Sequence, residues 1–524
     1  MKDLPQGWVE VEIGSVASIV AGGTPNSKEL KNFASPGCGV PWITPADLSG
    51  YKYQTVMNGA RDLSQQGYDS CSATLVPEGA VLFSSRAPIG YVAIAKQPVC
   101  TSQGFKNFVL PKGFESRFLY YQLKQLKAQA EALATGTTFK ELSTSAVSSL
   151  KVRIAPTAEQ SRIADKLDAL FGRIDACRER LDGIPRVLSN IRKKILDAAM
   201  SGDLTDDWRD ARPHLEKWEN RELASACVSG RVITYGVIKL GEEVAEGVPC
   251  LRTSNVRWLQ IDTSGLKRID PGISENYART VLEGGEVLVN VRGTLGGVAV
   301  SDESMKGWNV SREIAVVPCD RELFVPAFLA FWIAAPRTQQ KLSGMEKGVA
   351  YTGINLEDLR TLPVQRPDLA EQSEIVKRLE SLFGLVDAIE AKWSVARERV
   401  ERLTPALLEM AFSGELVNQD PSDPPAKSLL PEFAAAKIKW QSQVKRKARE
   451  RGTVMKASSD KSLVDIVEAM EQSEFTFDEL RLQVGKDYES IKKELFAALT
   501  ASQPRIEQYF DAQAKTMKLR RIKV

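Results

Sequence analysis

The chain has 524 residues, and its 70 Lys and Arg nearly balance its 67 Asp and Glu to give a formal net charge of +3. This length predicts three or four domains, each able to bury a core, and any binding of nucleic acid must depend on local basic patches. The only histidine, His214, nearly excludes a hydrolase that uses His chemistry and a metal site with His ligands.

The cysteines and the apolar runs indicate the compartment. Seven cysteines are scattered without a Cys-x-x-Cys pair, which argues against a disulfide framework and a zinc site and is typical of a reducing cytoplasm. The longest apolar run, residues 325–335, is too short to span a bilayer, and the first residues lack the apolar segment of a signal peptide. We therefore expect a cytoplasmic protein without a membrane partner.

Residues 1–156 are predicted to form a first α/β domain of short strands and turns. The stretch 8–13 alternates apolar and polar side chains like a strand, and a Gly-Gly-Thr-Pro turn follows it. A helix is expected from Phe118 to about Leu133, where Leu, Ala, Gln and Lys dominate, and Gly136 should end it.

A long helical region is predicted at 157–204, followed by a linker at 205–217. The region opens with Ala-Glu-Gln-Ser at 158–161, and its apolar side chains recur at alternating intervals of four and three residues. An average interval of about 3.5 residues is the period of a coiled-coil seam. Cys177 falls on this seam and is interpreted as a small core filler rather than a reactive thiol.

Residues 218–366 repeat the first domain more faintly. Gly-Val-Pro-Trp-Ile at 39–43 returns as Gly-Val-Pro-Cys-Leu at 247–251, and the stretch that ends at Arg86 returns as the stretch that ends at Arg292. The spacing drifts by a few residues between these matches, as diverged loops on a common scaffold allow. Matching scaffold positions with different loops indicate two related domains that read different ligands.

The helical region also returns, at 367–417. Residues 370–416 align with 158–204 without a gap at an offset of 212, and 16 of 47 positions are identical. Two equal seams in one chain are most simply interpreted as partners for each other, since two unrelated core helices would not share register, length and flanking motifs. Pro185 and Pro405 lie inside the seams and are predicted to kink or interrupt each helix by removing a backbone donor.

Residues 418–460 are predicted to form a Pro-rich connector, then a helix and a basic stretch. Eight Lys and Arg accompany one acid between 437 and 456, which is typical of a solvated tether, or of an arm that binds phosphate. Residues 461–524 should form a separate small unit in which three helices precede a hairpin. This order resembles a winged helix, a unit that could bind DNA or a partner protein.

The duplicated order of domain and helix, with Ala-Glu-Gln at each helix start and Ser-Gly-Asp/Glu-Leu at each helix end, resembles the specificity subunit of a type I restriction–modification enzyme. The resemblance covers roughly residues 1–440. It implies two α/β target recognition domains that alternate with two long helical repeats, which pair as an antiparallel coiled coil. In that family each recognition domain reads one part of a split DNA sequence, and the helices space the two domains and dock the modification subunits.

The resemblance also implies the partners. They are double-stranded DNA, two modification (methyltransferase) subunits and restriction (nuclease and translocase) subunits, with S-adenosylmethionine, ATP and Mg on the partner subunits and no cofactor on this chain. The residues agree with a subunit that is not catalytic by itself, because no Gly-x-x-x-x-Gly-Lys-Ser/Thr loop is present and Asp423-Pro-Pro-Ala lacks the aromatic residue of an amino-methyltransferase. The alternative is a protein–protein adaptor built of tandem repeated domains.

Candidate DNA contacts are polar side chains at strand ends and in loops of the two domains: Ser84, Ser85, Arg86, Thr137, Thr138, Lys140, Thr253, Asn255, Arg257, Asn290 and Arg292. Arg86 and Arg292 occupy equivalent positions, where a guanidinium can bind guanine or phosphate, or form a salt bridge inside its own domain. Ser84 and Ser85 differ from their counterparts and therefore suit specificity better.

The other candidates each have a structural alternative. Residues 137–140 are expected in a polar loop, where turn formation competes with a phosphate contact. Thr253, Asn255 and Arg257 are expected to alternate along one strand face, from which Asn255 could pair with adenine, or which could simply face solvent.

Phe171 and Phe383 occupy the same position beside the two seams. They are candidates for docking the modification subunits, with additional core packing as the alternative.

Overall fold

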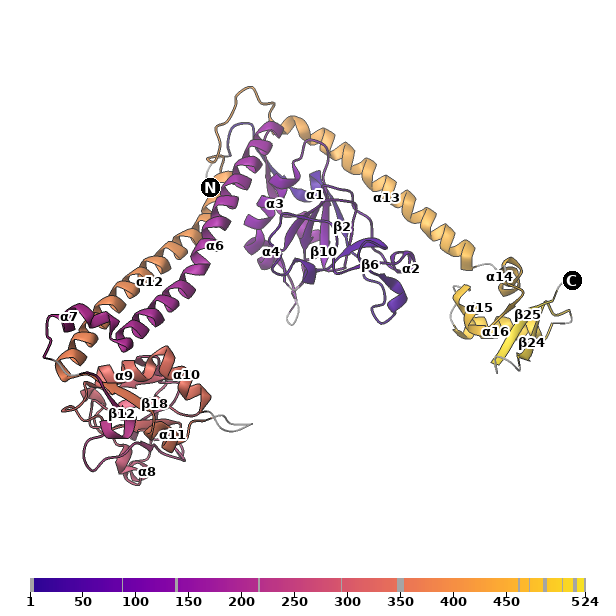
Figure 1. Ribbon diagram of the computed structural model, residues 1–524. Coiled ribbons are helices and arrows are strands. Elements are labelled where there is room, and N and C mark those ends of the chain that lie inside the picture. Colours follow the sequence, from indigo (N-terminus) through magenta and orange to yellow (C-terminus); the bar gives the residue numbers. More distant parts are fainter. Residues whose placement is uncertain are drawn as a thin grey trace. The chain divides into compact units, whose positions relative to one another are not determined.

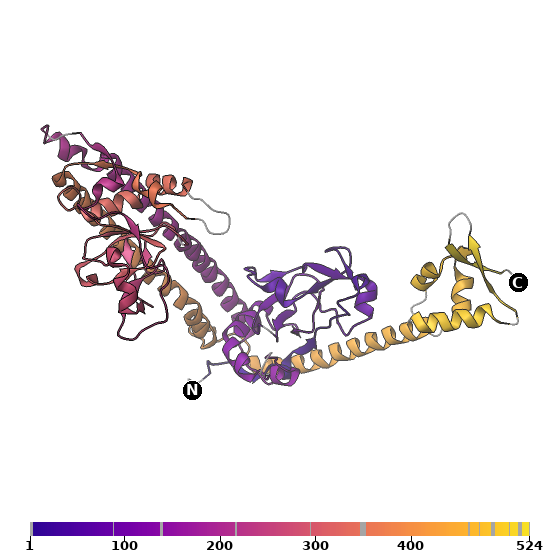
Figure 2. The same ribbon diagram turned by 90° about the horizontal axis from the view of Figure 1, so that it is seen from below.

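The computed structural model describes residues 4–86, 88–136, 140–214, 217–293, 295–345, 353–459, 462–470, 472–483, 488–501, 503–511 and 516–522. The chain divides into two compact units, which Figures 1 and 2 show from two sides. Unit 1 contains residues 1–173 and 403–524, and unit 2 contains residues 174–402. In the part of the chain that the structure describes, no helix combines the length and the apolar character needed to cross a membrane.

The first α/β domain lies in unit 1. Its strands are β1 (Val9–Glu12), β2 (Ser18–Ala21), β3 (Phe33–Ala34), β4 (Val40–Ile43), β5 (Thr55–Val56), β6 (Arg61–Leu63), β7 (Val81–Ser84), β8 (Val92–Ala95), β9 (Cys100–Thr101), β10 (Phe105–Val109) and β11 (Lys151–Ile154). Its helices are α1 (Ile13–Val16), α2 (Gln65–Asp69), α3 (Ser116–Gln125), α4 (Lys127–Leu133) and α5 (Thr144–Ser148), with short 3-10 turns η1 (Leu30–Asn32) and η2 (Pro45–Leu48).

A five-stranded sheet in the order β2-β10-β7-β8-β5 carries the core of this domain. All five residues of β10 are buried because cores cover both faces of the sheet: Phe108 lies in one core, and Phe105 and Val109 lie in another. A second sheet has the order β3-β6-β4-β9, and β1 pairs with β11. Residues 118–133, expected as one helix, form α3 and α4, which are separated at Leu126. The apolar face of α3, with Phe118 and Leu119 fully buried, packs in the core together with Phe83 and Phe108 of the sheet.

The second α/β domain lies in unit 2. Its strands are β12 (Glu219–Glu222), β13 (Thr234–Tyr235), β14 (Val248–Leu251), β15 (Val256–Arg257), β16 (Gln260–Ile261), β17 (Lys267–Ile269), β18 (Val287–Asn290), β19 (Val298–Val300), β20 (Asn309–Val310), β21 (Ile314–Val317) and β22 (Pro363–Arg366). Its helices are α8 (Pro271–Glu275), α9 (Pro326–Ala334), α10 (Pro336–Gly344) and α11 (Leu356–Arg360), with 3-10 turns η4 (Leu223–Ala226), η5 (Ala278–Thr280) and η6 (Glu303–Met305).

The two domains share one strand plan. The order β13-β21-β18-β19 corresponds to β2-β10-β7-β8, and β12 pairs with β22 as β1 pairs with β11. The sequence matches fall on equivalent strands, since β4 and β14 carry the Val-Pro stretches and β7 and β18 are fully buried. The apolar run of α9 is buried against this core and accounts for the longest apolar stretch of the sequence.

The two helical regions form α6 (Thr157–Ser201) and α12 (Leu369–Phe412). Aligned apolar residues are buried in both helices: Ile163 and Ile375, Leu167 and Leu379, Ile174 and Val386, Leu196 and Leu408, Ala199 and Ala411, and Met200 and Phe412. In unit 1, Ile163 at the start of α6 shares a core with Phe412 at the end of α12. In unit 2, Leu196 near the end of α6 shares a core with Ile375 at the start of α12. The helices therefore pair in opposite directions.

Two expectations about the helical regions need correction. Both helices continue through Pro185 and Pro405, so the predicted interruption is wrong, while a kink at either proline stays a prediction. Cys177 is exposed and fills no core, since a two-helix seam leaves parts of its edge open to solvent. The expected linker contains α7 (Asp206–Asp210), and the Asp207 carboxylate accepts a hydrogen bond from Arg378 Nη1 at 2.6 Å, which holds this segment on α12.

The last part of the chain begins with the 3-10 turn η7 (Ala426–Leu429) and α13 (Leu430–Ser459). The C-terminal unit follows with α14 (Leu463–Ala469), β23 (Glu474–Phe475), α15 (Phe477–Gln483), α16 (Tyr488–Leu499), β24 (Ile506–Asp511) and β25 (Thr516–Arg521). The three helices and the hairpin match the expected order, and β23 adds a third strand in the order β23-β25-β24. Assignment of this unit to the winged helices stays a prediction.

Candidate nucleic-acid interface

The serines after β7 do not face solvent. Ser84 and Ser85 are both fully buried. Ser84 Oγ donates to the Pro88 carbonyl at 2.8 Å and accepts from the Tyr91 N–H at 2.8 Å, while Ser85 Oγ donates to the Gly104 carbonyl at 3.3 Å. The expectation that these two serines read bases is therefore wrong for this structure, because their hydrogen bonds are used to shape the loop that follows the strand.

Arg86, the next residue, is partly exposed. Its guanidinium lies 3.7 Å from the Glu141 carboxylate, and its backbone bridges to Glu141. Burial lowers the pKa of the nearby Lys106, with Glu141 opposing and Arg86 reinforcing that change. The salt bridge considered as the alternative for Arg86 is thus present, although with 41% of the side chain exposed the guanidinium can still reach a ligand. Lys140 is exposed beside it, while Thr137 and Thr138 lie outside the described residues.

In the second domain the asparagines are structural. Asn290 is buried, and its amide donates to the carbonyls of Val256 at 2.9 Å and Thr253 at 3.2 Å. Asn255 is also buried, accepts from the Arg252 N–H at 3.0 Å and donates to the Asp262 carbonyl at 2.8 Å. These bonds fold a turn onto the end of β18, so neither amide is available to pair with a base.

The expected strand face at 253–257 is also wrong. Thr253 and Asn255 lie in a turn, and only Val256 and Arg257 belong to β15. The reason is the Asn255 side chain, which takes the place of strand partners by binding the backbone of its own loop. Arg257 points to solvent, 62% exposed, with its guanidinium 2.7 Å from the Asp262 carboxylate.

Arg292 repeats the position of Arg86. Its backbone bridges to Gly353 as that of Arg86 bridges to Glu141, and its guanidinium lies 5.3 Å from the centre of the Tyr235 ring. Exposed donors among the candidates are therefore Arg86, Lys140, Arg257 and Arg292. Guanidinium and ammonium groups of this kind bind phosphate oxygens or the acceptors of guanine.

Each domain is attached to the start of its following helix by a buried glutamine. Gln160 Oε1 accepts from the Glu115 N–H at 2.9 Å, and its Nε2 donates to the Ala155 carbonyl at 2.8 Å. Gln372 does the same in the second half, where it accepts from the Val325 N–H at 2.8 Å and donates to Leu323 and Pro367. Both side chains are fully buried. In the sequence this glutamine stands out only as part of a repeated motif, and its recurrence is the signal that could have indicated a structural role.

The glutamate of the same motif is buried as well. Glu371 accepts from Thr205 Oγ1 and from Trp218 Nε1, each at 2.9 Å, and lies 3.6 Å from the Arg209 guanidinium. Its counterpart Glu159 is equally buried, and this burial raises its pKa. The Ala-Glu-Gln start of each helix is therefore a connection between helix and domain.

Phe171 and Phe383 contribute to the same connections. The ring of Phe171 stacks on Tyr121 of α3 with centroids 5.2 Å apart, and the ring of Phe383 packs on Trp258 at 5.8 Å and on Phe331 at 6.0 Å. Each ring is partly buried against the core of its own unit. The packing alternative thus accounts for both residues, and they are poor candidates for docking a partner.

Polar contacts fix the helix pairing inside unit 2. Arg192 of α6 lies 2.7 Å from the Glu390 carboxylate of α12, while Arg178, earlier in α6, pairs with Glu401, later in α12, at 3.1 Å. Trp393 Nε1 donates to the Leu181 carbonyl at 2.8 Å between them. The partners run in opposite directions along the two helices, which confirms an antiparallel pair.

Comparisons with known proteins agree with this duplicated architecture. The family model described as type I restriction modification DNA specificity domain matches residues 5–186 and 216–394. The chain is 29% identical over 428 residues to the type I restriction enzyme EcoBI specificity subunit of Escherichia coli, which covers 79% of this chain and 87% of that protein. It is 36% identical over 166 residues to the MjaIX specificity subunit of Methanocaldococcus jannaschii. That match covers 31% of this chain and 38% of that protein.

Two solved structures share the fold. The HsdS subunit from Thermoanaerobacter tengcongensis aligns with a TM-score of 0.52 at 19% identity, covering 79% of this chain and 98% of that one. A chain from a study of complex assembly in the type I R-M system aligns with a TM-score of 0.54 at 18% identity, covering 79% of this chain and all of that one. With both halves matched by the family model, the chain belongs to the family of type I restriction–modification specificity subunits.

Proposed function

We propose that this chain is the DNA sequence-recognition subunit of a type I restriction–modification complex, and that each α/β domain reads one part of a split target. The observation that carries the proposal is the duplication. Two domains with one strand plan are connected to paired helices by the same glutamine bonds, while the loops that follow equivalent strands differ. A shared scaffold with unlike loops suits the reading of two unlike half-sites.

The contacts follow from the exposed donors. Arg86 and Arg292 share one position in the two domains, so phosphate positioning suits them better than the reading of different bases. Arg257 and Lys140 have no such counterpart at an equivalent site and are the better candidates for base contacts within the original set. Loss of a base contact costs about 1–3 kcal/mol at one position, whereas loss of a phosphate contact weakens binding to all sequences alike.

Partners supply the chemistry in this proposal. Two modification subunits would dock on the paired helices, and restriction subunits would join the complex, with S-adenosylmethionine, ATP and Mg held by those partners and the complex located in the cytoplasm. Exposed apolar side chains along the paired helices support a docking role, since Leu385 is 62% and Ile389 is 50% exposed. The purified chain alone should transfer no labelled methyl group to DNA, and transfer without partners would contradict the assignment.

A domain exchange tests the modular reading. Residues 1–156 are replaced by the equivalent domain of a relative, and the target is determined by selection from randomised duplex DNA in the presence of the modification subunits. One half of the target should change and the other should stay. A simultaneous change of both halves would refute the assignment of one half-site to each domain.

The role of the helices as a spacer has its own test. One heptad is inserted between Leu181 and Ile184 and another between Trp393 and Ala396, two places that face each other because Trp393 donates to Leu181. Seven residues lengthen a helix by about 10 Å, and the heptad preserves the seam. The unread gap should grow by roughly three base pairs, with lower affinity because the half-sites also rotate about the DNA axis by roughly 100°. An unchanged gap in a folded variant would mean that the helices do not set the spacing.

A further inference from the structure

The helix α13 and the C-terminal unit lie outside the family match. The family model ends at residue 394, and the solved relative that is aligned over its whole length covers only 79% of this chain. The fold shared with these relatives therefore leaves about a fifth of the chain unaccounted for, and nothing in the reading of a split target assigns a task to it.

The first turns of α13 are fixed to the first recognition domain. Phe433 is fully buried and stacks on Phe114 with ring centroids 5.8 Å apart and an interplanar angle of 9°. Lys437 Nζ donates to the Gly14 carbonyl, and Trp440 packs against the core that contains Val20. The helix is thus anchored by three successive turns rather than tethered by a flexible connector.

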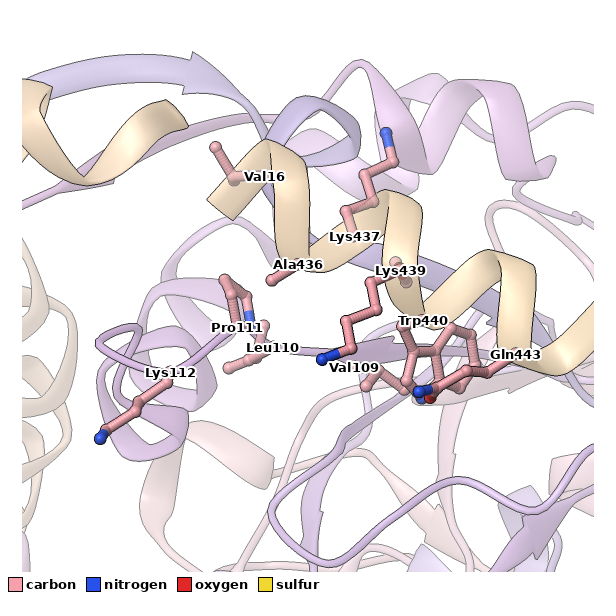
Figure 3. Close-up of a pocket in the computed structure, with 11 residues that line it drawn as sticks. Val16, Val109, Leu110, Pro111, Lys112, Ala436, Lys437, Lys439, Trp440 and Gln443 are labelled. Atoms are coloured by element: carbon pink, nitrogen blue, oxygen red, sulfur yellow. The ribbon is translucent and has the colours of Figure 1, made fainter. Parts of the chain in front are cut away.

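Figure 3 shows this contact, in which Ala436, Lys439 and Trp440 of α13 lie beside Val109 and Pro111. A cavity of about 240 Å³ remains between the helix and the domain. Its lining mixes apolar side chains from the helix and the domain with Ser18, Lys112, Lys439 and Gln443, and no set of polar groups converges on one point. The contact serves to hold the helix.

The direction of α13 is set by these contacts. Lys437 binds the carbonyl of Gly14 in α1, and α13 then lies against β2. Because β2 and β7 are both antiparallel neighbours of β10, residue 21 of β2 and residue 84 of β7 lie at the same end of the sheet, beside Phe105 and Lys106. The helix therefore advances toward the end of the sheet from which Arg86 extends.

Beyond the anchor the sequence of α13 becomes basic. Between residues 437 and 456 there are eight Lys and Arg and one acid. Lys439, Lys445 and Arg446 are exposed, and in the described residues neither Lys439 nor Lys445 has a carboxylate within ion-pair distance. A run of positive charge with a single acid, part of it on exposed side chains, matches a polyanion.

We propose that α13 is an arm that binds the DNA backbone beside the half-site read by the first recognition domain. The proposal rests on the proposed function, because that function places duplex DNA at this domain. Lys and Arg of the arm neutralise phosphates and release condensed counterions, which adds affinity without adding sequence information. The anchor at Phe433 and Trp440 fixes where along the duplex this added affinity is applied.

The test uses the full chain assembled with modification subunits. The arm variant carries Lys439→Gln, Lys445→Gln and Arg446→Gln. The control variant loses the same charge from exposed positions of unit 1 outside the arm and the paired helices, through Lys96→Gln, Lys151→Gln and Lys427→Gln. Binding to a fluorescent target duplex is measured from about 50 to 200 mM salt, a range over which six to ten phosphate contacts change affinity by about 10³–10⁵-fold. For three lost contacts the slope of log K against log salt should become shallower by about 2–3, while the selected bases stay the same.

The outcomes separate the two proposals. If the wild-type complex binds the duplex and the arm variant binds with the same affinity and salt slope, the arm proposal alone is overturned. An equal loss of affinity in the control variant would show a general charge effect and would also overturn the arm proposal. If the arm variant lost binding to polyglutamate but not to DNA, an acidic protein would replace DNA as the partner and the proposal would fail. Failure of the wild-type complex to bind any duplex would overturn the proposed function and the arm with it.

Discussion

The glutamine connections between helix and domain make a quantitative prediction, because the chain contains the same device twice. Gln372→Met keeps the length of the side chain and removes its amide. The change deprives the Val325 N–H of its acceptor at 2.8 Å and the carbonyls of Leu323 and Pro367 of donors at 3.0 and 2.9 Å. The site is fully buried, so water cannot replace these partners without opening the junction.

The expected cost follows from the number of groups left unpaired. A buried polar group without a partner costs about 1–3 kcal/mol, and the N–H dominates because buried proteins tolerate an under-satisfied carbonyl better than an unpaired N–H. We therefore expect about 3 kcal/mol for Gln372→Met. Gln160→Met should cost nearly the same, since Gln160 accepts from Glu115 at 2.9 Å and donates to Ala155 and Gly113 at 2.8 and 3.4 Å. With a urea dependence of about 3 kcal/mol per M, each midpoint should fall by about 1 M.

Urea unfolding and hydrogen exchange together provide the assay. The matched controls make the same substitution at exposed glutamines, Gln66→Met in the first domain and Gln340→Met in the second. Exchange of the peptide that contains Val325 should accelerate in Gln372→Met and stay unchanged in Gln340→Met. A midpoint shift below about 0.2 M together with normal protection of Val325 would show that the amide bonds do not hold the junction.

Three further predictions concern charge, thiols and pH. Arg192→Glu should weaken the helix pair in unit 2 by about 1 kcal/mol, as measured by thermal unfolding. The loss should shrink in 1 M salt as charges are screened. Adding Glu390→Lys should restore part of it, because Asp387 still faces residue 192. The exposed thiols of Cys38 and Cys177 should react with a thiol reagent before that of Cys250, whose pKa is raised to about 12 by burial; equal rates at pH 8 would contradict the packing. Burial opposes ionisation of Glu286, but hydrogen bonds from backbone N–H groups and from Ser301 outweigh burial and lower the pKa of Glu286. The ionised carboxylate therefore stabilises the fold above the pKa of an unfolded glutamate. This stabilisation is lost as the pH falls through the lower pKa of the folded state. Glu286→Gln should therefore flatten the stability profile below about pH 4.5, and identical profiles for both proteins would refute this account.

The sequence by itself determined the helical frame of this protein. A seam of period 3.5 and a repeated Ala-Glu-Gln start are local patterns, and a helix expresses such patterns directly because its side-chain spacing is fixed by its own backbone. The buried strands β7 and β18 were equally readable, since a short apolar run needs no long-range information to be placed inside. The duplication of these local signals also led to the family.

Only the tertiary structure decided which polar residues are available to DNA. Ser84, Asn255 and Asn290 looked like reading side chains, but each is buried and hydrogen-bonded to backbone. Ser84 and Asn255 bond their own loops, and Asn290 bonds the turn at 253–256. A polar side chain at a strand end has the same sequence signature whether it shapes a loop or faces a ligand, because the difference lies in which segment folds over it. For the same reason Gln160 and Gln372, which the sequence presented only as repeat markers, became buried connections once the domain and the helix were in contact.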